Sequence, residues 1–234
     1  MRRALAQIRW FGLRRCCPVC QSKVTRFLPG GVVPRPNALC PVCGSAERHR
    51  LDWYFMKNNT DLFNGKRKSL LHVAPEYEIS NRLGKVGFLD YWTSSLNGEN
   101  TRAKIDITKI SFPDNHFDAI YCSHVLEHVT EDRRAIREFW RILRPGRWAL
   151  LQVPITPGLD VTAEDKTVVD ANERARLYGQ WDHVRAYGAD YPDRLREAGF
   201  NVTVFRAGDI LSPKQITLWG IETTEERIFY CQKL

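Results

Sequence analysis

FDAIYCSHVLEHVTEDRRAIREFWRILRPGRWALLQV, residues 117–153, is the stretch of sequence that decides the fold. Its ends, residues 117–122 and 148–153, are short and mainly apolar, as buried strands are. Between them, Thr130 and the two acids that follow it favour the start of a helix. One apolar helix face follows at the spacing i, i+3, i+4, i+7, made of Ile136, Phe139, Trp140 and Leu143. Pro145-Gly146 is expected to end this helix, so the stretch predicts a strand, a helix and a second strand.

The same alternation extends over most of the chain. Further strands are expected at 69–74, 88–92, 103–107, 202–205 and 228–232, and further helices at 47–57, 76–83 and 190–198. This order favours an α/β fold with a doubly wound, mostly parallel sheet. Ligands of such sheets bind beyond the carboxyl ends of the strands. We therefore expect functional residues directly after Val73, Trp92 and Cys122, and at Asp106.

Four cysteines near the start of the chain have the spacing of a metal site. Cys17-Pro-Val-Cys20 and Cys40-Pro-Val-Cys43 are two near-identical turns with nineteen residues between them. Each C-x₂-C turn aims two thiolates at one point, and two such turns complete a tetrahedron around Zn²⁺. Cys16 breaks this spacing and is expected to be a spectator. Because protein fills all four positions, we predict a structural zinc ribbon.

The ribbon and the sheet predict two domains, a basic segment with the ribbon at 1–45 and an α/β domain at 46–234. Formal net charge is +8, yet residues 1–50 hold ten Lys/Arg and one acid, so this segment carries +9 and the remainder −1. Such a segment can meet nucleic acid, an anionic membrane surface or an acidic substrate, or it can be solvated surface charge. These readings stay open.

The sequence has no apolar run long enough to span a membrane and no signal-peptide core, so a cytoplasmic location is the default expectation. Ahead of the ribbon, Leu5, Ile8, Phe11 and Gly12 share helical spacing between arginines. We expect a short amphipathic helix that packs on the ribbon. A membrane anchor or a transit peptide are the alternatives.

Several blocks, taken in order, match a known family. They are 106–118 (DITKISFPDNHFD), 122–129 (CSHVLEHV), 139–146 (FWRILRPG), 183–185 (HVR) and 197–200 (EAGF). The series resembles class I S-adenosylmethionine-dependent methyltransferases, in the branch similar to ubiquinone-biosynthesis methyltransferases, over residues 69–205. The resemblance implies a Rossmann-like sheet and S-adenosyl-L-methionine as the methyl donor.

The resemblance places the cofactor's methionine end at the loop after the first strand of the domain. The family has glycines there, which let backbone approach the cofactor, and an acid just before them. Here Ala74 and Glu76 flank Pro75 where glycines are usual, and His72 holds the acid's position. Glu76 either reaches the methionine ammonium or only favours the dipole of the helix that it opens.

The resemblance places the adenosine between the second and third strands. The family's ribose-binding acid is replaced by Ser95, a weaker partner than a carboxylate. Asp90 or Glu99 can take over that role. Asp106 matches the adenine-side acid, with Ile107 beside it, and Ser123 follows the strand that faces the transferred methyl.

Methyl transfer needs alignment of acceptor and donor, and a base only if the acceptor must lose a proton. His183 is the first candidate base because Asp182 is next to it, and His124 is the second; a purely positioning role is the alternative for His183. His124-x-x-Glu127-His128 also spells a metalloprotease pattern, but it follows a strand instead of lying within a long helix. The motif is similar to the Glu-x-x-Glu-His metal motif of some O-methyltransferases, with His124 in place of the first acid.

Three functions follow as expectations. The first is methyl transfer to oxygen or nitrogen of a small molecule or saccharide, with structural Zn²⁺ in the ribbon. The second is RNA methylation, in which the basic ribbon holds phosphates; the ribbon lacks the interleaved aromatics of single-strand binders. The third is a non-catalytic module that kept the fold and lost its grip on the cofactor.

Overall fold

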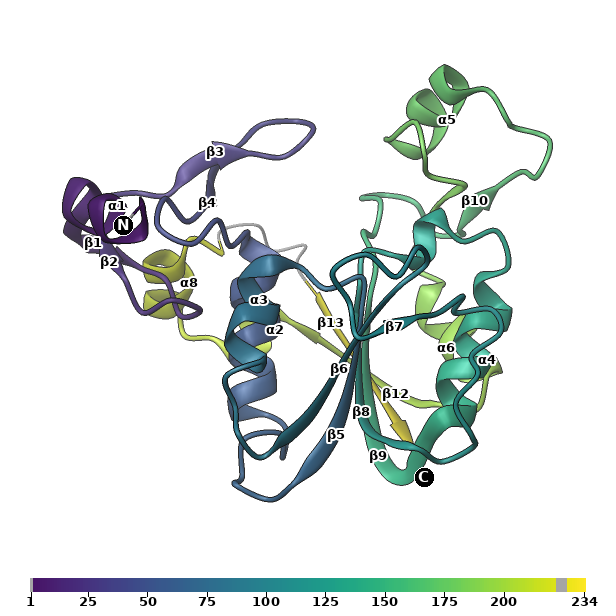
Figure 1. Ribbon diagram of the computed structural model, residues 1–234. Coiled ribbons are helices and arrows are strands. Elements are labelled where there is room, and N and C mark those ends of the chain that lie inside the picture. Colours follow the sequence, from purple (N-terminus) through teal and green to yellow (C-terminus); the bar gives the residue numbers. More distant parts are fainter. Residues whose placement is uncertain (1, 222–226) are drawn as a thin grey trace. The chain divides into compact units, whose positions relative to one another are not determined.

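The computed structural model describes residues 2–221 and 227–234 (Figure 1). They divide into two compact units. The first unit comprises Met1–Lys66, Glu76–Phe88 and Phe205–Ile228, and the second comprises Arg67–Pro75, Leu89–Val204 and Phe229–Leu234. The cysteine segment therefore shares a compact unit with helices from two later parts of the chain. The boundary expected at residues 45/46 falls inside the first unit and stays a prediction.

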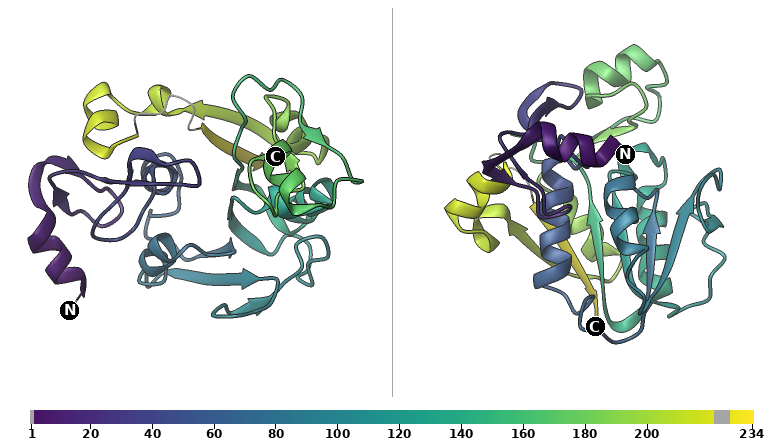
Figure 2. Two further views of the ribbon diagram at one scale, coloured as in Figure 1. Left: turned by 90° about the horizontal axis from the view of Figure 1, so that it is seen from above. Right: turned by 60° about the vertical axis from the view of Figure 1, so that its left-hand side comes forward.

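The first unit contains two small hairpins and several helices. Its elements are α1 (Arg2–Trp10), β1 (Phe11–Cys16), β2 (Lys23–Val24), β3 (Leu28–Gly30), β4 (Arg35–Leu39), α2 (Glu47–Asn58), α3 (Tyr77–Leu83), α7 (Ala207–Ile210) and α8 (Pro213–Trp219). The strands pair antiparallel, β1 with β2 and β3 with β4. One C-P-V-C turn connects the strands of the first hairpin, and the other follows the second hairpin. Helices α2 and α3 lie side by side (Figures 1 and 2).

Helix α1 forms as expected, but it does not bury its apolar residues. Leu5 is 60% exposed and Ile8 is 77% exposed, while Phe11 already belongs to β1. The helix contacts β2 of the first hairpin, and Gln7 Nε2 lies 3.2 Å from Ser22 Oγ. It therefore packs on the ribbon as expected, although Leu5 and Ile8 remain largely exposed.

The second unit is built around a seven-stranded sheet. Its strands, from edge to edge, are β12 (Asn201–Arg206), β13 (Arg227–Lys233), β9 (Leu143–Gln152), β8 (Phe117–Ser123), β5 (Lys68–Val73), β6 (Leu89–Ser95) and β7 (Ala103–Lys104). Neighbours from β9 to β7 pair in parallel, and β13 pairs antiparallel with β9. This confirms the mostly parallel, Rossmann-like sheet.

Helices α4 (Asp132–Ile142) and α6 (Tyr191–Glu197) lie against one face of the sheet (Figure 1). The stripe predicted from residues 136 to 143 faces that sheet, since Ile136, Phe139 and Leu143 are fully buried in the main core. Leu143, however, is not helical. It opens β9 and pairs with Phe117, so the strand already begins before Pro145-Gly146.

The chain between β9 and α6 has little regular structure. It holds two-residue strands β10 (Ala163–Glu164) and β11 (Arg185–Ala186), which pair antiparallel, and helix α5 (Ala171–Tyr178). A one-turn helix, η1 (Leu126–His128), follows β8. Within the described ranges 2–221 and 227–234, no helix is long and apolar enough to cross a membrane.

Candidate functional site

The parallel strands bring the predicted residues to one edge of the sheet. Val73 at the end of β5 pairs with Ser94 on one side and Cys122 on the other. Ser95 pairs with Lys104, and Ser123 with Gln152. Because these strands run in the same direction, the residues that follow them share the carboxyl edge, where sheets of this type bind ligands.

The loop after β5 contains a backbone conformation that normally needs glycine. Ala74 has a φ of +46°, and its N–H donates to Ser94 O at 2.7 Å. Ala74 is exposed, so its backbone is accessible, although no glycine is present. His72 is fully buried in the strand before it, with Nδ1 2.8 Å from Tyr91 Oη. The residue in the family's acid position therefore has a partner inside the sheet.

Glu76 belongs to the first unit and precedes α3. One carboxylate oxygen lies 3.7 Å from Nε2 of His49. His49 Nδ1 accepts a hydrogen bond from Ala46 N, so in the neutral ring Nε2 carries the proton and faces Glu76. Glu76 thus contacts an imidazole in its own unit. Pro75, the residue before it, is the last residue of a segment of the second unit.

The two adenosine-side positions differ in what their side chains already contact. Ser95 Oγ donates to Asn97 Oδ1 at 2.9 Å and accepts from Gly98 N at 3.0 Å, so it closes the turn after β6. Asp106 is exposed, and Oδ1 accepts from the N–H and the hydroxyl of Thr108, both at 2.8 Å. The backbone bond, followed by the hydroxyl bond, lowers the pKa of Asp106. Asp106 is therefore an exposed carboxylate held in a fixed orientation, and Ile107 beside it is buried in the core.

The end of β8 holds a buried hydroxyl and a strained histidine. Ser123 is buried, and its Oγ has no hydrogen-bond partner among the described residues. His124 has a φ of +54°, an uncommon value for a residue other than glycine. Its N–H donates to Gln152 O at 2.9 Å, which fixes it beside the end of β9. Strained backbone of this kind often accompanies a functional site.

His183, in the segment before β11, lies beside the residues that follow β8. The His183 and His128 ring centroids are 4.8 Å apart. Asp182 contacts His128, with Oδ2 3.2 Å from Nδ1. His183 Nδ1 instead lies 3.0 Å from Tyr178 O. The pairing of Asp182 with His183 that we expected from their adjacency is therefore not the one the structure has.

Glu127, His128 and His183 each offer one ligand atom, and these atoms lie within 4.8 Å of one another. Glu127 Oε1 is also 3.3 Å from His124 Nδ1. The sequence pointed to the motif from His124 to His128 but did not connect it with His183. No local pattern reports this grouping, because it depends on how the chain returns past η1.

Arg185 fixes this return of the chain. The side chain is almost fully buried, and Nη1 donates to Leu126 O at 2.9 Å and Val129 O at 2.6 Å. Its Nε donates to Glu164 at 2.9 Å, which ties β10 to the same place. Val184 N donates to Glu127 O at 2.9 Å. These bonds attach the segment of His183 directly to η1.

The four predicted zinc ligands form a second cluster, in the first unit. The sulfur atoms of Cys17, Cys20, Cys40 and Cys43 all lie within 4.8 Å of one another. Cys17 Sγ is 3.7 Å from Cys43 Sγ, and Cys20 Sγ is 3.8 Å from Cys40 Sγ. Four thiolates at about 2.3 Å from a tetrahedral Zn²⁺ are separated by roughly 3.8 Å. The cluster has the dimensions of a Cys₄ metal site.

A buried cation beside this cluster fits a metal-bound tetrathiolate. Arg50 is fully buried, and its hydrogen bonds go to the carbonyl oxygens of Ala38, Ser45, Asn37 and Gly220. Burial lowers its pKa, while the neighbouring Cys17 and then Glu47 act in the opposite direction. A buried charge needs a countercharge. Four thiolates around Zn²⁺ carry a net charge of −2 and supply one.

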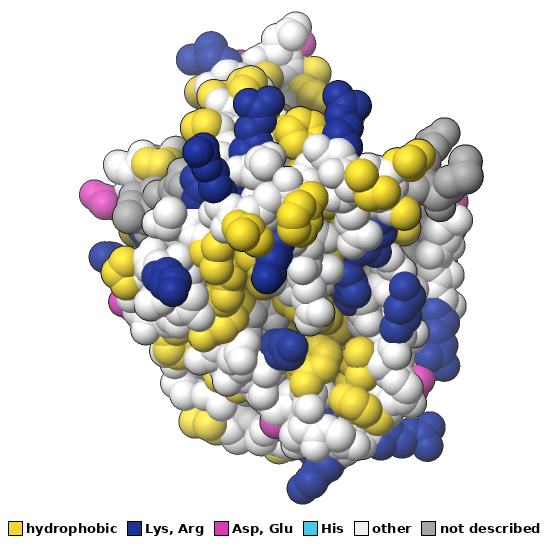
Figure 3. Space-filling view, turned by 90° about the vertical axis from the view of Figure 1, so that its left-hand side faces the viewer, with side chains coloured by type: hydrophobic (Ala, Val, Ile, Leu, Met, Phe, Trp, Pro, Cys, Tyr) yellow, Lys and Arg dark blue, Asp and Glu magenta, His cyan; other side chains and the backbone are white. Residues whose placement is uncertain are grey.

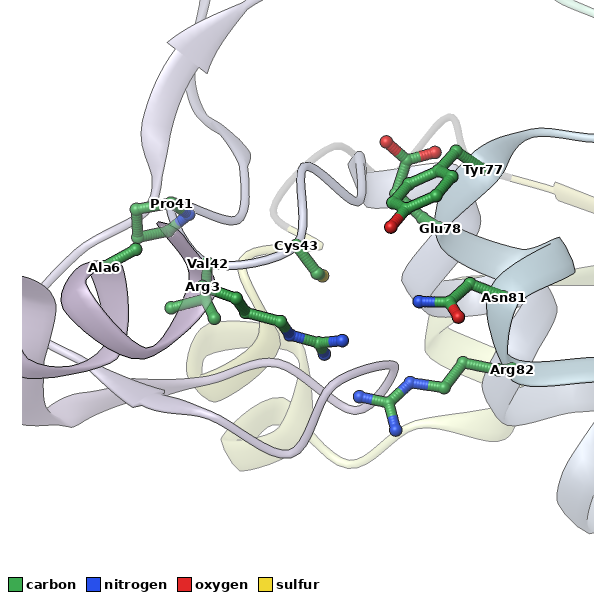
Figure 4. A pocket seen from close by; sticks show the side chains of 9 residues that line it. All are labelled: Arg3, Ala6, Pro41, Val42, Cys43, Tyr77, Glu78, Asn81 and Arg82. Atoms are coloured by element: carbon green, nitrogen blue, oxygen red, sulfur yellow. The ribbon is translucent and has the colours of Figure 1, made fainter. Parts of the chain in front are cut away.

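A cavity of about 310 Å³ lies next to this cluster (Figure 4). Arg3 and Arg82 extend into it from opposite sides, and Asn81 and Tyr77 lie on the α3 side. The face on which α1 lies shows scattered Lys and Arg among apolar side chains and few acids (Figure 3). The first unit therefore presents positive charge both on its surface and in this cavity.

Residues 81–151 match the methyltransferase domain family. The ubiquinone/menaquinone biosynthesis C-methyltransferase of Pseudomonas paraeruginosa is 35% identical over 69 residues, which are 30% of this chain and 27% of that protein. The corresponding enzyme of Ectopseudomonas mendocina is 31% identical over 87 residues, 37% of this chain and 34% of that protein. The chain thus aligns with about a third or less of the length of these relatives.

Two solved structures share the fold. An S-adenosylmethionine-dependent methyltransferase from Mesorhizobium loti superposes with a TM-score of 0.54 at 14% identity, covering 77% of this chain and 97% of that chain. The CMeT domain of the citrinin polyketide synthase gives a TM-score of 0.52 at 14% identity, covering 83% of this chain and 54% of that chain. The sheet therefore has the Rossmann-like fold found in methyltransferases.

Proposed function

We propose that this protein transfers a methyl group from S-adenosyl-L-methionine to oxygen or nitrogen of a small molecule or saccharide. The match to the methyltransferase domain family and the Rossmann-like fold support this proposal. The observation that supports this best is the carboxyl edge of the sheet. There Ala74 and Asp106 follow two of the parallel strands and Ser123 ends a third, in the order the family resemblance implies.

Each of these residues has a role in the proposal. Asp106 accepts hydrogen bonds on the adenine side, and the exposed backbone of Ala74 approaches the methionine end. His72, Pro75, Ser95 and Ile107 complete the proposed cofactor contacts, His72 and Ile107 through backbone atoms because their side chains are buried. Ser123 and His124 lie where the methyl is transferred. His183 and His124 are the proposed bases. In the neutral His183 ring, Nδ1–H donates to Tyr178 O, so Nε2 keeps a lone pair that can accept a proton.

Zn²⁺ held by Cys17, Cys20, Cys40 and Cys43 is the second part of the proposal. Its role is structural, since the four thiolates leave no position for water or substrate. The spacing of the sulfur atoms and the buried Arg50 support it. The ion organises the first unit and takes no part in the methyl transfer.

The cofactor assignment is tested by calorimetric titration of S-adenosylmethionine. Asp106→Ala is expected to weaken binding by about 1–3 kcal/mol, the usual cost of losing hydrogen bonds to a charged group. Asp165→Ala is the matched control. Asp165 Oδ1 accepts from the N–H and hydroxyl of Thr167 just as Asp106 does from Thr108, but Asp165 follows the two-residue strand β10, which is not part of the seven-stranded sheet. Equal effects of the two variants would indicate that only the turn matters.

RNA methylation is the second candidate, favoured by the positive charge of the first fifty residues. In that case RNA binding weakens steeply with salt, because phosphate contacts release counterions. Normal methylation of a small acceptor by a chain with neutralised N-terminal arginines would exclude this alternative. If wild-type protein binds no S-adenosylmethionine at millimolar concentration, the non-catalytic binding module replaces both candidates.

A further inference from the structure

We propose that Glu127, His128 and His183 form a binding site for a divalent transition-metal ion, separate from the cysteine cluster. Glu127 and His128 lie in η1, directly after β8, and His183 lies before β11. One ligand atom from each residue lies within 4.8 Å of the other two. The site is therefore at the carboxyl edge of the sheet, beside Ser123 and His124.

The hydrogen bonds of both imidazoles leave lone pairs for a metal. His183 Nδ1 is 3.0 Å from a carbonyl oxygen, that of Tyr178, and so carries the proton that it donates. His128 Nδ1 lies 3.2 Å from Asp182 Oδ2, so this carboxylate favours the tautomer with the proton on Nδ1. Nε2 of each neutral ring is then unprotonated. Metal-binding histidines commonly have this arrangement, with the second ring nitrogen donating to a carbonyl or a carboxylate.

Two buried acceptors at this place have no donor. Glu127 is only 1% exposed, and its Oε2 has no hydrogen-bond partner within the described part of the chain. His183 is 4% exposed, and its Nε2 has none either. A buried acceptor without a donor is costly, and a buried carboxylate more so. A cation between these two atoms satisfies both.

The ligands are held in place before any ion binds. Val184, the residue after His183, donates its backbone N–H to Glu127 O at 2.9 Å. Arg185 donates to the carbonyl oxygens of Leu126 and Val129, which lie on either side of the two η1 ligands. His124 Nδ1 lies 3.3 Å from Glu127 Oε1 and orients this carboxylate. His124 is therefore a positioning residue for the ligand and not part of the ligand set.

The donor set selects the kind of ion. Two imidazole nitrogens and one carboxylate oxygen suit Zn²⁺, Fe²⁺, Co²⁺ or Ni²⁺ better than Mg²⁺ or Ca²⁺, which prefer oxygen ligands. Two ligand atoms that are each about 2.1 Å from a shared ion are at most roughly 4.2 Å apart. The three ligand atoms here lie within 4.8 Å of one another, so a small side-chain rotation brings them to binding distance. His128 and Asp182 are about one-third exposed, which leaves the remaining positions of the ion open to solvent and substrate.

The chemical role of this metal site rests on the proposed methyl transfer. If the ion binds the acceptor, the acceptor is a molecule with a hydroxyl group. The hydroxyl oxygen binds an open position of the ion, which lowers the hydroxyl pKa. Because His183 then binds the ion through Nε2, it no longer acts as the base proposed above, and the hydroxyl proton passes to water or to His124. The oxygen forms a bond to the methyl carbon as the carbon–sulfur bond breaks, and the sulfur keeps that electron pair. The products are a methyl ether and S-adenosylhomocysteine.

The test is a titration of the 234-residue chain, carrying a single equivalent of zinc, with Co²⁺, followed by visible absorption. Thiolates bind Zn²⁺ more tightly than Co²⁺, so the cysteine cluster keeps its zinc. Any exchange there would appear as a separate sulfur-to-cobalt charge-transfer band. Wild-type protein is expected to develop d–d bands that saturate at one equivalent. His128→Ala, Glu127→Gln and His183→Ala are expected to weaken Co²⁺ binding by at least ~10-fold, since even outer-shell changes cost that much.

His116→Ala is the control, because His116 stacks on Phe112 away from this cluster. His128 is exposed, so its variant keeps the fold and decides the question even if a buried variant unfolds, as circular dichroism would reveal. The proposal is overturned if wild type develops no saturating d–d bands up to millimolar Co²⁺, or if His128→Ala binds as wild type does. S-adenosylmethionine titration without added metal reports separately on the proposed function.

Discussion

At the scale of single residues, Ala74 is a position where sequence and backbone conformation disagree. Its φ of +46° is a value that alanine adopts only with strain, at a cost of roughly 1–2 kcal/mol. Glycine has no such strain but loses about 0.4–1 kcal/mol more conformational entropy on folding. Ala74→Gly is therefore expected to stabilise the protein by roughly 0.5–1 kcal/mol, measured by urea unfolding.

A helical alanine provides the contrast. Ala175 lies inside α5 and is exposed, so Ala175→Gly is expected to destabilise by roughly 0.5–1 kcal/mol. Destabilisation of both variants by the same amount would mean that Ala74 is unstrained in solution. Ala74→Gly also restores the residue type that the family has at this position, so its S-adenosylmethionine affinity should not fall.

The sequence located the candidate residues better than it located their partners. Asp106 and Ser123 lie at the strand ends where the alternating pattern placed them. The neighbours of a side chain, however, depend on pairing between distant segments. Asp182 is next to His183 in the sequence but contacts His128, and the Ser95 hydroxyl is used within its own turn.

At the scale of elements, the strands and helices with clear periodicity were predictable, and the ambiguous ones were not. Leu143 fits both the apolar stripe of α4 and the register of β9, and pairing with Phe117 decides for the strand. The chain from 154 to 189 has no sustained period. Its two short strands form because Arg185 and Arg194 bind Glu164, which is a tertiary interaction without a local signature.

Glu164 makes this segment sensitive to acid. Partial burial raises the pKa of Glu164, but hydrogen bonds from Arg194 and Arg185 outweigh it and lower the pKa from 4.5 to about 2. Because the pKa is lower in the folded protein, ionised Glu164 stabilises the folded state. This contribution is fully present above pH 4.5 and is lost as the pH falls toward 2. Hydrogen exchange over β10 and β11 is therefore expected to accelerate within this window.

Variants separate Glu164 from the other carboxylates. Glu164→Gln is expected to show fast exchange in β10 and β11 already at neutral pH, with a much smaller change between pH 4.5 and 2. Glu173→Gln is the matched control, since Glu173 is an exposed residue of α5 whose ion pair with Arg176 is 3.9 Å long. An unchanged acid response in Glu164→Gln would assign the effect to another group.

At the scale of the whole molecule, the first unit is assembled from three separate parts of the chain. Arg50 Nη2 donates to Gly220 O at 3.0 Å, which joins α2 to the end of α8. Gly220 has a φ of +61°, and a Cβ there would lie 2.6 Å from the Phe27 ring. The cysteine spacing predicted the metal cluster, but nothing in the sequence indicated that residues 205–228 join the same unit.

This assembly predicts how far the effect of zinc extends. Cys20→Ser and Cys43→Ser are each expected to lose one equivalent of zinc, measured by elemental analysis. Without the metal the buried Arg50 loses its countercharge and the hairpins lose their anchor, because small metal-bound segments take their folding energy from the ion. Hydrogen exchange is then expected to rise throughout the first unit, including α8, and to change little in β8 and β9.

Cys16→Ser is the matched control, since Cys16 lies outside the four-sulfur cluster, and it should keep its zinc and its exchange pattern. Purified protein without zinc, or loss of zinc in Cys16→Ser alone, would contradict the assignment. If exchange rises only in residues 11–45 after zinc loss, the ribbon folds by itself, as the predicted boundary at residue 45 implies. If α8 loosens with it, Arg50 and Gly220 transmit the effect, and the compact unit is also the unit of unfolding.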